Sequence, residues 1–160
     1  MKIYSHSMKN GDNLPFKFVF NGLGYDGGNI SPHIGWSDIP ENTRSLILTC
    51  YDPQAPSGSG WWHWIVANIS PEVNELAENA GESNARLPQG ATHTRNDYGQ
   101  ANYGGAAAAA GEPHGYIFTV YALNVSHIDV DEMSSGAMAG FLLNQHKIAE
   151  ASLTVYFPYA

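Results

Sequence analysis

The chain has 160 residues, which is the usual size of one compact domain and enough to bury a core without disulfide bonds or a structural metal. Only 14% of the residues are charged, while Gly, Pro and aromatic residues are frequent, which favours strands joined by tight turns over long surface helices. The formal charge of −8 comes from 15 acidic and 7 basic residues with no run of Lys or Arg, which argues against nucleic-acid binding. We therefore expect one mainly β domain over residues 1–160.

The amino-terminal segment lacks the apolar stretch of a secretory signal, and no segment has the roughly 18 apolar residues that a membrane-spanning helix needs. We therefore expect a cytoplasmic protein with no integral membrane segment. The single cysteine, Cys50, lies in an apolar run and is expected to be a buried, unreactive thiol.

The first half of the chain predicts three strands. Residues 16–20 alternate between apolar and polar side chains, as in a half-buried strand. Residues 45–51 form a continuous apolar run, which is typical of a central strand covered on both faces, and this strand ends at Asp52. After a loop with two prolines, residues 61–69 form the next strand, whose period of two places Trp61 and His63 on one face and Trp62 and Trp64 on the other.

The second half of the chain predicts two helices, a long loop and two strands. Residues 70–81 predict a short amphipathic helix, and residues 82–112 predict mainly a long loop. Residues 116–123 predict a strand, preceded by His114. Ser134 or Ser135 is suited to cap a helix over about residues 137–148, and the alternating residues 153, 155 and 157 predict a last strand.

Three polar side chains lie at predicted strand ends beside loops rich in Gly and Pro: Asp52, His63 and His114. If they meet, two imidazoles that donate hydrogen bonds and a carboxylate that orients one of them would suit a phosphate or carboxylate group between aromatic walls. Spacing alone leaves an alternative, in which His63 is a core residue, Asp52 caps a turn and His114 is an ordinary loop residue. The other histidines, at positions 6, 33, 93, 127 and 146, are expected to be mostly exposed to solvent.

Four ordered blocks of the sequence resemble the signature of the phosphatidylethanolamine-binding protein (PEBP) family, and in particular its short bacterial branch, often labelled Raf kinase inhibitor-like. The blocks are Asp52-Pro-x-Ala-Pro56; Gly60-Trp-Trp-His63-Trp-x-Val-x-Asn68; Asn96-Asp-Tyr-Gly99 with Tyr103-x-Gly105; and His114-x-Tyr116-x-Phe-Thr-Val-Tyr-Ala-Leu123.

The resemblance implies a β-sandwich with a large central antiparallel sheet, a smaller sheet and one or two peripheral helices. It also implies a pocket for phosphate-like anions and phospholipid head groups, without metal or cofactor. The implied ligand-binding residues are Asp52, Pro56, Trp61, His63, His114 and Tyr116. The chain departs from the family pattern beside this pocket, because residues 106–110 are alanines where relatives often carry prolines, and Gly115 stands where they usually carry arginine.

The sequence thus favours a binding protein over an enzyme, with a small anion as partner. A protein-binding regulator, or an inhibitor of a kinase or protease, stays open by analogy with eukaryotic members. A metal-dependent hydrolase is less favoured, because no local pair of metal ligands accompanies the histidines. A homodimer through an exposed sheet face is also plausible, because Trp62, Trp64 and several tyrosines are more than one side of the core needs to bury, although large aromatic side chains more often lie in the core.

Overall fold

The computed structural model describes residues 1–108, 111 and 113–158, and most of their regular structure is two antiparallel sheets. The large sheet has the strand order β6-β4-β3-β7-β8, and the small sheet has the order β1-β2-β5. The strands are β1 (Lys2–Tyr4), β2 (Ile34–Ser37), β3 (Ser45–Asp52), β4 (Trp61–Ile69), β5 (Glu75–Leu76), β6 (Thr92–His93), β7 (His114–Leu123) and β8 (Lys147–Phe157). The helical elements are one α-helix, α1 (Gly136–His146), and three single 3₁₀ turns, η1 (Phe16–Phe18), η2 (Ala80–Glu82) and η3 (Asn84–Arg86).

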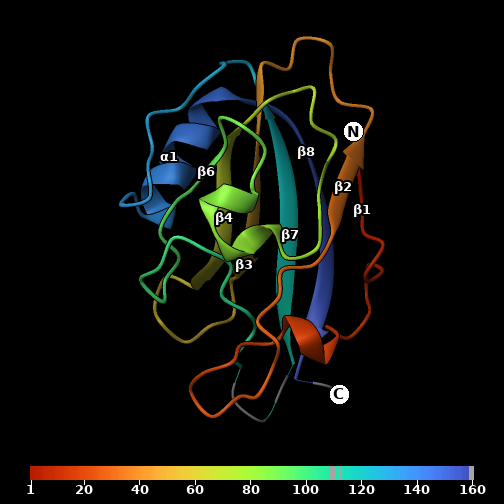
Figure 1. Ribbon diagram of the computed structural model, residues 1–160, viewed down its shortest axis with the longest axis vertical. Helices are drawn as coiled ribbons and strands as arrows, with labels where there is room; N and C mark the ends of the chain where they lie inside the picture. The colour runs from red at the N-terminus through yellow and green to blue at the C-terminus, as the bar shows by residue number, and fades with distance from the viewer. Residues whose placement is uncertain (109–110, 112, 159–160) are drawn as a thin grey trace.

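The large sheet lies between two different layers, with the small sheet on one side and α1 on the other (Figure 1). The larger core cluster fills the space toward the small sheet and includes Leu48, Phe118 and, from β2, Trp36. A smaller cluster fills the space under α1 and includes Ile47 and Leu143. These layers match the predicted mainly β sandwich with a large central sheet, a smaller sheet and a peripheral helix.

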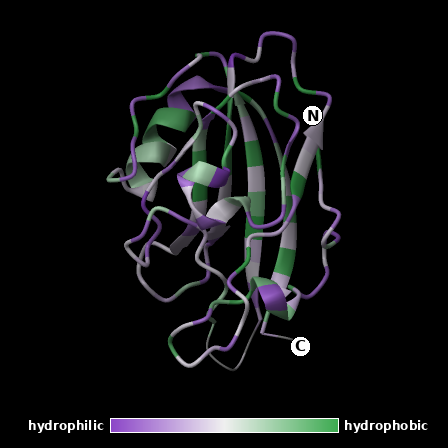
Figure 2. Cartoon of the chain, in the orientation of Figure 1, coloured by the Kyte–Doolittle hydropathy of each residue, from purple (hydrophilic) through white to green (hydrophobic). Residues whose placement is uncertain are grey.

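Strand β3 is buried on both faces, because β4 and β7 pair with its two edges while the two core clusters cover its faces. Six of its eight residues in a row, from Ser45 to Cys50, are buried. The edge strand β8 alternates instead over its second half, where Leu153, Val155 and Phe157 are buried, and bands of apolar and polar residues along it are visible in Figure 2. The continuous apolar run and the alternating runs in the sequence therefore correspond to central and outer strands, as predicted.

Helix α1 begins where the sequence predicts, because Ser135 accepts a hydrogen bond from the backbone N–H of Met138 over 3.1 Å. It ends at His146, two residues earlier than predicted, since the chain enters β8 there. Its buried side covers Trp62, and Trp64 is fully buried in the larger core cluster. Packing within one chain therefore accounts for both tryptophans, with Trp64 fully buried and Trp62 partly buried under the helix.

The contact between α1 and Trp62 requires glycine at the start of the helix. A Cβ atom added at Gly136 would lie 2.4 Å from Trp62 Cδ1, whereas one added at Gly140 would lie 3.8 Å from Trp62 Cζ2. We expect Gly136→Ala to lower the free energy of unfolding by about 2 kcal/mol, because the ring has to move. Gly140→Ala on the same helix is the matched control and is expected to raise it by up to about 1 kcal/mol through helix propensity. Urea denaturation followed by tryptophan fluorescence checks both, and a stabilising Gly136→Ala would contradict the packing.

Two predicted elements were wrong. Residues 16–20 do not form a strand, because Phe18 and Val19 donate backbone hydrogen bonds to Pro15 and Phe16 and so close the turn η1. Residues 70–81 do not form an α-helix: a turn at Ser70 leads into β5, which pairs with β2. After the turn, the backbone N–H of Phe20 donates to the carbonyl of Ala106, so in both places a partner distant in sequence also takes backbone groups that the local pattern assigned elsewhere.

The expectation of mostly exposed histidines was wrong for His33 and His93, which are both buried. His93 accepts a hydrogen bond from Trp64 Nε1 over 2.9 Å, and its Nδ1 lies 2.9 Å from Asn84 Oδ1. Because the amide oxygen can only accept, His93 carries its hydrogen on Nδ1. Burial lowers its pKa from 6.5 to about 4, so this histidine is neutral at physiological pH.

The described residues contain no helix that is long and apolar enough to cross a membrane.

Candidate functional site

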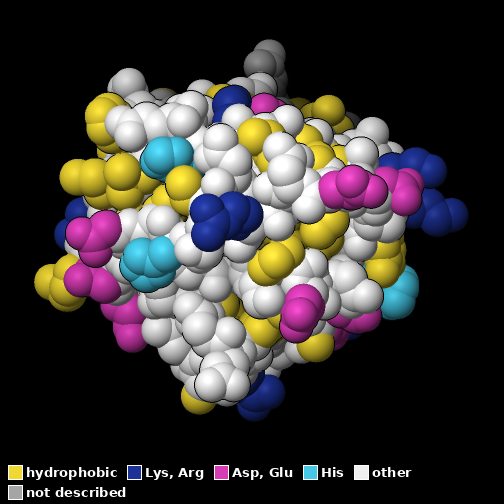
Figure 3. All heavy atoms as spheres, turned by 90° about the horizontal axis from the view of Figure 1, so that it is seen from above, with side chains coloured by type: hydrophobic (Ala, Val, Ile, Leu, Met, Phe, Trp, Pro, Cys, Tyr) yellow, Lys and Arg dark blue, Asp and Glu magenta, His cyan; other side chains and the backbone are white. Residues whose placement is uncertain are grey.

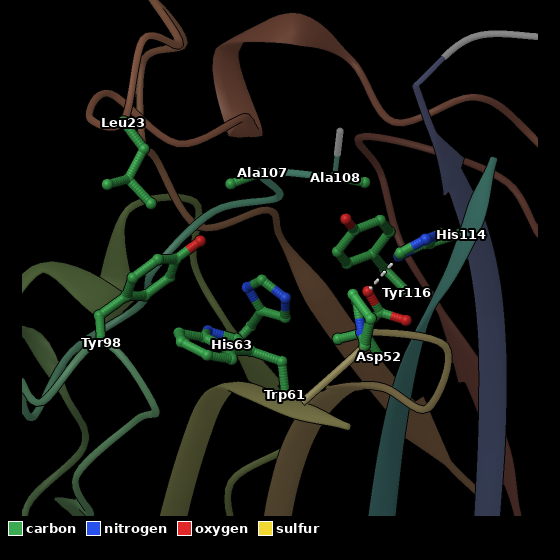
Figure 4. Close-up of a pocket in the computed structure, with 11 residues that line it drawn as sticks. Leu23, Asp52, Trp61, His63, Tyr98, Ala107, Ala108, His114 and Tyr116 are labelled. Atoms are coloured by element: carbon green, nitrogen blue, oxygen red, sulfur yellow. Dashed lines mark hydrogen bonds and ion pairs between the residues drawn. The ribbon is translucent and has the colours of Figure 1, made fainter. Parts of the chain in front are cut away.

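One end of the large sheet carries a cavity of about 330 Å³, and all six residues that the sequence singled out lie on its wall (Figure 4). The wall is mostly apolar. Its complete lining is Leu23, Asp52, Ala55, Pro56, Trp61, His63, Tyr98, Ala107, Ala108, His114 and Tyr116. The structure thus brings Asp52, His63 and His114 to one place.

The antiparallel topology explains why these residues meet. Strand β3 ends at Asp52, whereas its neighbours β4 and β7 begin at Trp61 and His114, so the three residues lie at the same end of the sheet. Asp52 pairs directly with Trp61 across the β3–β4 ladder. Because the intervening loop contains two prolines, the chain cannot extend the ladder beyond this point, and the cavity opens there.

A β-bulge in β4 aims His63 into the cavity. Cys50 pairs with Trp64 and Tyr51 pairs with Trp62, so His63 is an extra residue without an opposite partner. His63 and Trp64 consequently turn toward the same side of the sheet: His63 lines the cavity and Trp64 enters the larger core. The predicted sharing of a face by Trp61 and His63 holds, but the placement of Trp64 on the opposite face was wrong, because a strict period of two does not survive a bulge.

Asp52 orients His114. The Oδ2 atom of Asp52 lies 2.7 Å from His114 Nδ1, and its Oδ1 accepts a hydrogen bond from the backbone N–H of Gln54. The Gln54 side chain then accepts from the backbone N–H of Gly115 over 2.6 Å, which ties the proline loop to β7. Since Asp52 is only 2% exposed, its charge is matched by this histidine and by backbone donors rather than by water.

His63 is held by a backbone group instead. Its Nδ1 lies 2.8 Å from the carbonyl oxygen of Gly104, so Nδ1 donates and the ring tautomer is determined. Burial lowers the pKa of His63 from 6.5 to about 4, although the carbonyl of Gly104 and the charge of Asp52 act in the opposite direction. His63 is therefore neutral at physiological pH, with Nδ1 protonated and Nε2 bare. This differs from the expectation that both imidazoles donate to a ligand.

Aromatic rings pack against His63 and against each other in the cavity wall. Tyr98 and Tyr116 approach it edge-on, with ring centroids 5.8 and 5.1 Å away, and Trp61 packs edge-on against Tyr98 at 5.3 Å. The Nε1 atom of Trp61 is buried and has no hydrogen-bond partner in the described part of the chain. Burial raises the pKa of both tyrosines above the usual range, so their hydroxyls stay protonated.

The rim of the cavity is formed by two loops that are fastened to each other. Leu23 lies on one loop with a positive φ of 55° and is 77% exposed, and Tyr25 donates a hydrogen bond from its hydroxyl to the carbonyl of Ala108 on the other. The run of alanines at 106–110, where the family often has prolines, lies partly outside the described residues, because 109 and 110 are not among them. Residues 106–108 lie against the segment around Val19, with which Ala106 forms a β-bridge.

The sequence missed part of the wall. Tyr98 belongs to a block that carried the family resemblance, so that block was the signal that could have placed it in the site. Leu23, by contrast, lies in a Gly-rich turn with no local pattern that points to the cavity. Within residues 1–108, 111 and 113–158, no three His, Cys, Asp or Glu side chains are grouped to hold a metal ion.

A second cavity lies at the opposite end of the sheet, near the start of β3 and the end of β4, and includes Arg44, Ser126 and His127 in its wall. Figure 3 looks onto this end, where acidic and basic side chains are scattered rather than gathered into one charged face. It contains none of the six predicted site residues.

Comparison with known proteins supports the resemblance over nearly the whole chain. The family model described as phosphatidylethanolamine-binding protein matches residues 4–158. The chain is 51% identical over 157 residues to the UPF0098 protein YbhB of Escherichia coli, covering 98% of this chain and 99% of that protein. It is 48% identical over 155 residues to YbcL of the same organism, covering 96% of this chain and 85% of that protein.

Solved structures agree with the sequence comparison. The crystal structure of E. coli YbcL, described as a member of the mammalian PEBP family, superposes with a TM-score of 0.96 at 45% identity and covers 99% of this chain and 98% of that one. A PEBP homologue from Chlamydia trachomatis superposes with a TM-score of 0.80 at 28% identity, covering 99% and 97% of the two chains. The chain belongs to the phosphatidylethanolamine-binding protein family.

Proposed function

We propose that the chain binds a small anion, either phosphate or a phosphate-bearing head group, in the cavity formed by Asp52, His63 and His114. The observation that carries the proposal is the convergence of these polar side chains in an otherwise apolar cavity. A concave, mostly apolar site with a few converging polar groups is the usual form of a small-molecule site. Pro56, Trp61 and Tyr116 would form the walls against which the ligand packs.

The charges around the cavity suggest how an anion would be accepted. His114 donates from Nδ1 to Asp52, and the backbone N–H of Gln54 donates to the other oxygen of the same carboxylate. These hydrogen bonds offset part of the negative charge that would otherwise repel an anion. His63 would contribute as a neutral group, because burial keeps its pKa near 4.

A binding role agrees with the absence of a catalytic arrangement around these residues. The described wall of the cavity includes no Ser, Thr or Cys side chain, so it supplies no hydroxyl or thiol nucleophile of that kind for His63 or His114 to activate. Cys50 is buried beneath the site, and burial raises the pKa of its thiol, which makes it a poor nucleophile.

The proposal is tested by titrating the isotope-labelled protein with inorganic phosphate and with phosphoethanolamine, following backbone and imidazole resonances. We expect saturable shifts confined to residues around Asp52, His63 and His114. His114→Ala is expected to weaken binding about tenfold or more, because a hydrogen bond to a charged ligand contributes about 1.5–3 kcal/mol.

His127→Ala is the matched control, since His127 is an exposed histidine on the second cavity at the other end of the sheet. It is expected to bind phosphate like the unsubstituted protein. If no resonance near the cavity shifts at high ligand concentration, the anion-binding role is refuted and a protein-binding regulatory role gains support.

A further inference from the structure

The hydrogen bond between His63 and Gly104 determines which atom this histidine offers to the cavity. A carbonyl oxygen has no hydrogen to donate, so Nδ1 must carry one, and the neutral ring then has a lone pair on Nε2. The hydrogen bond of the His63 ring among the described residues is the one from Nδ1, the carbonyl of Gly105 lies nearby, and the ring lines the cavity between Tyr98 and the Asp52–His114 pair (Figure 4). The cavity therefore presents an acceptor at this point.

Protonation of Nε2 is opposed by the surroundings of His63. The charged and titratable groups that affect it are Asp52 from β3, Asp97 from the loop after β6, and the rings of Tyr98, Tyr116 and His114. The carbonyls of Gly104 and Gly105 and the two carboxylates favour the protonated ring, but the burial of His63, which is only 3% exposed, disfavours it more strongly. His63 thus remains an acceptor across the neutral pH range.

We propose that the cavity selects oxyanions that carry a proton of their own, such as a monoprotonated phosphate or phosphomonoester, over oxyanions of the same shape and charge that carry none. The P–OH of such a ligand donates to His63 Nε2. An unprotonated oxyanion would instead bring an oxygen lone pair against the nitrogen lone pair and leave a buried acceptor unsatisfied, which costs about 1–3 kcal/mol. This inference rests on the proposed anion-binding function and names the ligand class within it.

Methyl phosphate and methyl sulfate isolate this single difference. A phosphomonoester has its second pKa near 6, so at pH 6 about half of methyl phosphate is a monoanion with one P–OH. Methyl sulfate is also a monoanion of nearly the same shape, but it has no proton to donate. Neither ligand has an ammonium group, which in phosphoethanolamine could donate to His63 in place of P–OH.

The experiment is a titration of the unsubstituted protein with each ligand at pH 6, followed by NMR. We expect the monoprotonated form of methyl phosphate to bind about tenfold more tightly than methyl sulfate, as one satisfied acceptor implies. The ¹⁵N resonance of His63 Nε2 is expected to move as for a nitrogen that accepts a hydrogen bond. Equal affinity, or tighter binding of methyl sulfate, overturns the inference and leaves the anion site standing. Binding of neither ligand overturns the proposed function and this inference with it.

The dependence on pH supplies a second readout that requires no variant. Between pH 7 and pH 8 the apparent affinity for methyl phosphate is expected to fall by up to tenfold more than that for methyl sulfate, because only the phosphate ester loses its proton. A pH effect of the protein that acts equally on both ligands cancels in the ratio. A ratio of the two affinities that does not change with pH overturns the inference.

The variant His63→Gln has an amide that can either accept or donate a hydrogen bond. It is expected to bring the ratio of the affinities for methyl phosphate and methyl sulfate near one.

Discussion

Lowering the pH from 7 to 5 is expected to lower the free energy of unfolding by about 2 kcal/mol through His93 alone and by a similar amount through His63. Both side chains are buried, and burial lowers each pKa from 6.5 to about 4. Between these two values the unfolded chain binds protons that the folded chain does not, so the free energy of unfolding decreases as the pH falls. At pH 5 the difference corresponds to about 1.5 pK units for each group, at 1.36 kcal/mol per unit.

Urea denaturation at pH 7 and pH 5 measures this effect, and His93→Gln isolates one contribution. The amide of Gln can accept from Trp64 and donate to Asn84, as His93 does, but it does not titrate. The loss of stability between the two pH values is therefore expected to be about 2 kcal/mol smaller in His93→Gln than in the unsubstituted protein. An identical loss in both proteins would show that His93 does not remain neutral in the fold.

Gly105→Ala is expected to lower the free energy of unfolding by about 3 kcal/mol and to weaken anion binding. A Cβ atom at this position would lie 2.4 Å from the carbonyl oxygen of Phe18 and 2.6 Å from the backbone nitrogen of Phe20. Both are backbone atoms, so the clash cannot be relieved by rotating a side chain, and the two loops must separate. Because these loops carry Ala107, Ala108 and Leu23, the cavity wall is expected to shift with them.

Gly99→Ala is the control for this substitution. Gly99 has a φ of +94° but no atom within 4 Å of the added Cβ, so the substitution costs only backbone strain of about 1 kcal/mol. Denaturation measures the stabilities, and phosphate titration measures the binding. Equal losses of stability in the two variants would show that the loops at Phe18 and Gly105 are not closely packed.

Sequence patterns predicted the central elements of the fold, because their signals are local. The apolar run of β3, the alternation in β8 and the capping serine of α1 each involve neighbouring residues, and each element formed where its pattern indicated. The patterns failed for residues 16–20 and 70–81, where short segments took backbone partners from distant parts of the chain. Such short segments carry too little local preference to resist a tertiary partner.

By itself, the sequence determined the family, the mainly β architecture and the six residues that line the cavity, because motif blocks and strand ends are readable along the chain. Only the tertiary structure decided which way the side chains of the site point and which histidine nitrogens carry a hydrogen. The bulge that turns His63 and Trp64 to one side depends on the register of β3 against β4. The bare nitrogen of His63 depends on a carbonyl 41 residues away, and the pairing of His114 depends on a carboxylate 62 residues away. Protonation states follow burial and non-local hydrogen bonds, which no stretch of sequence specifies alone.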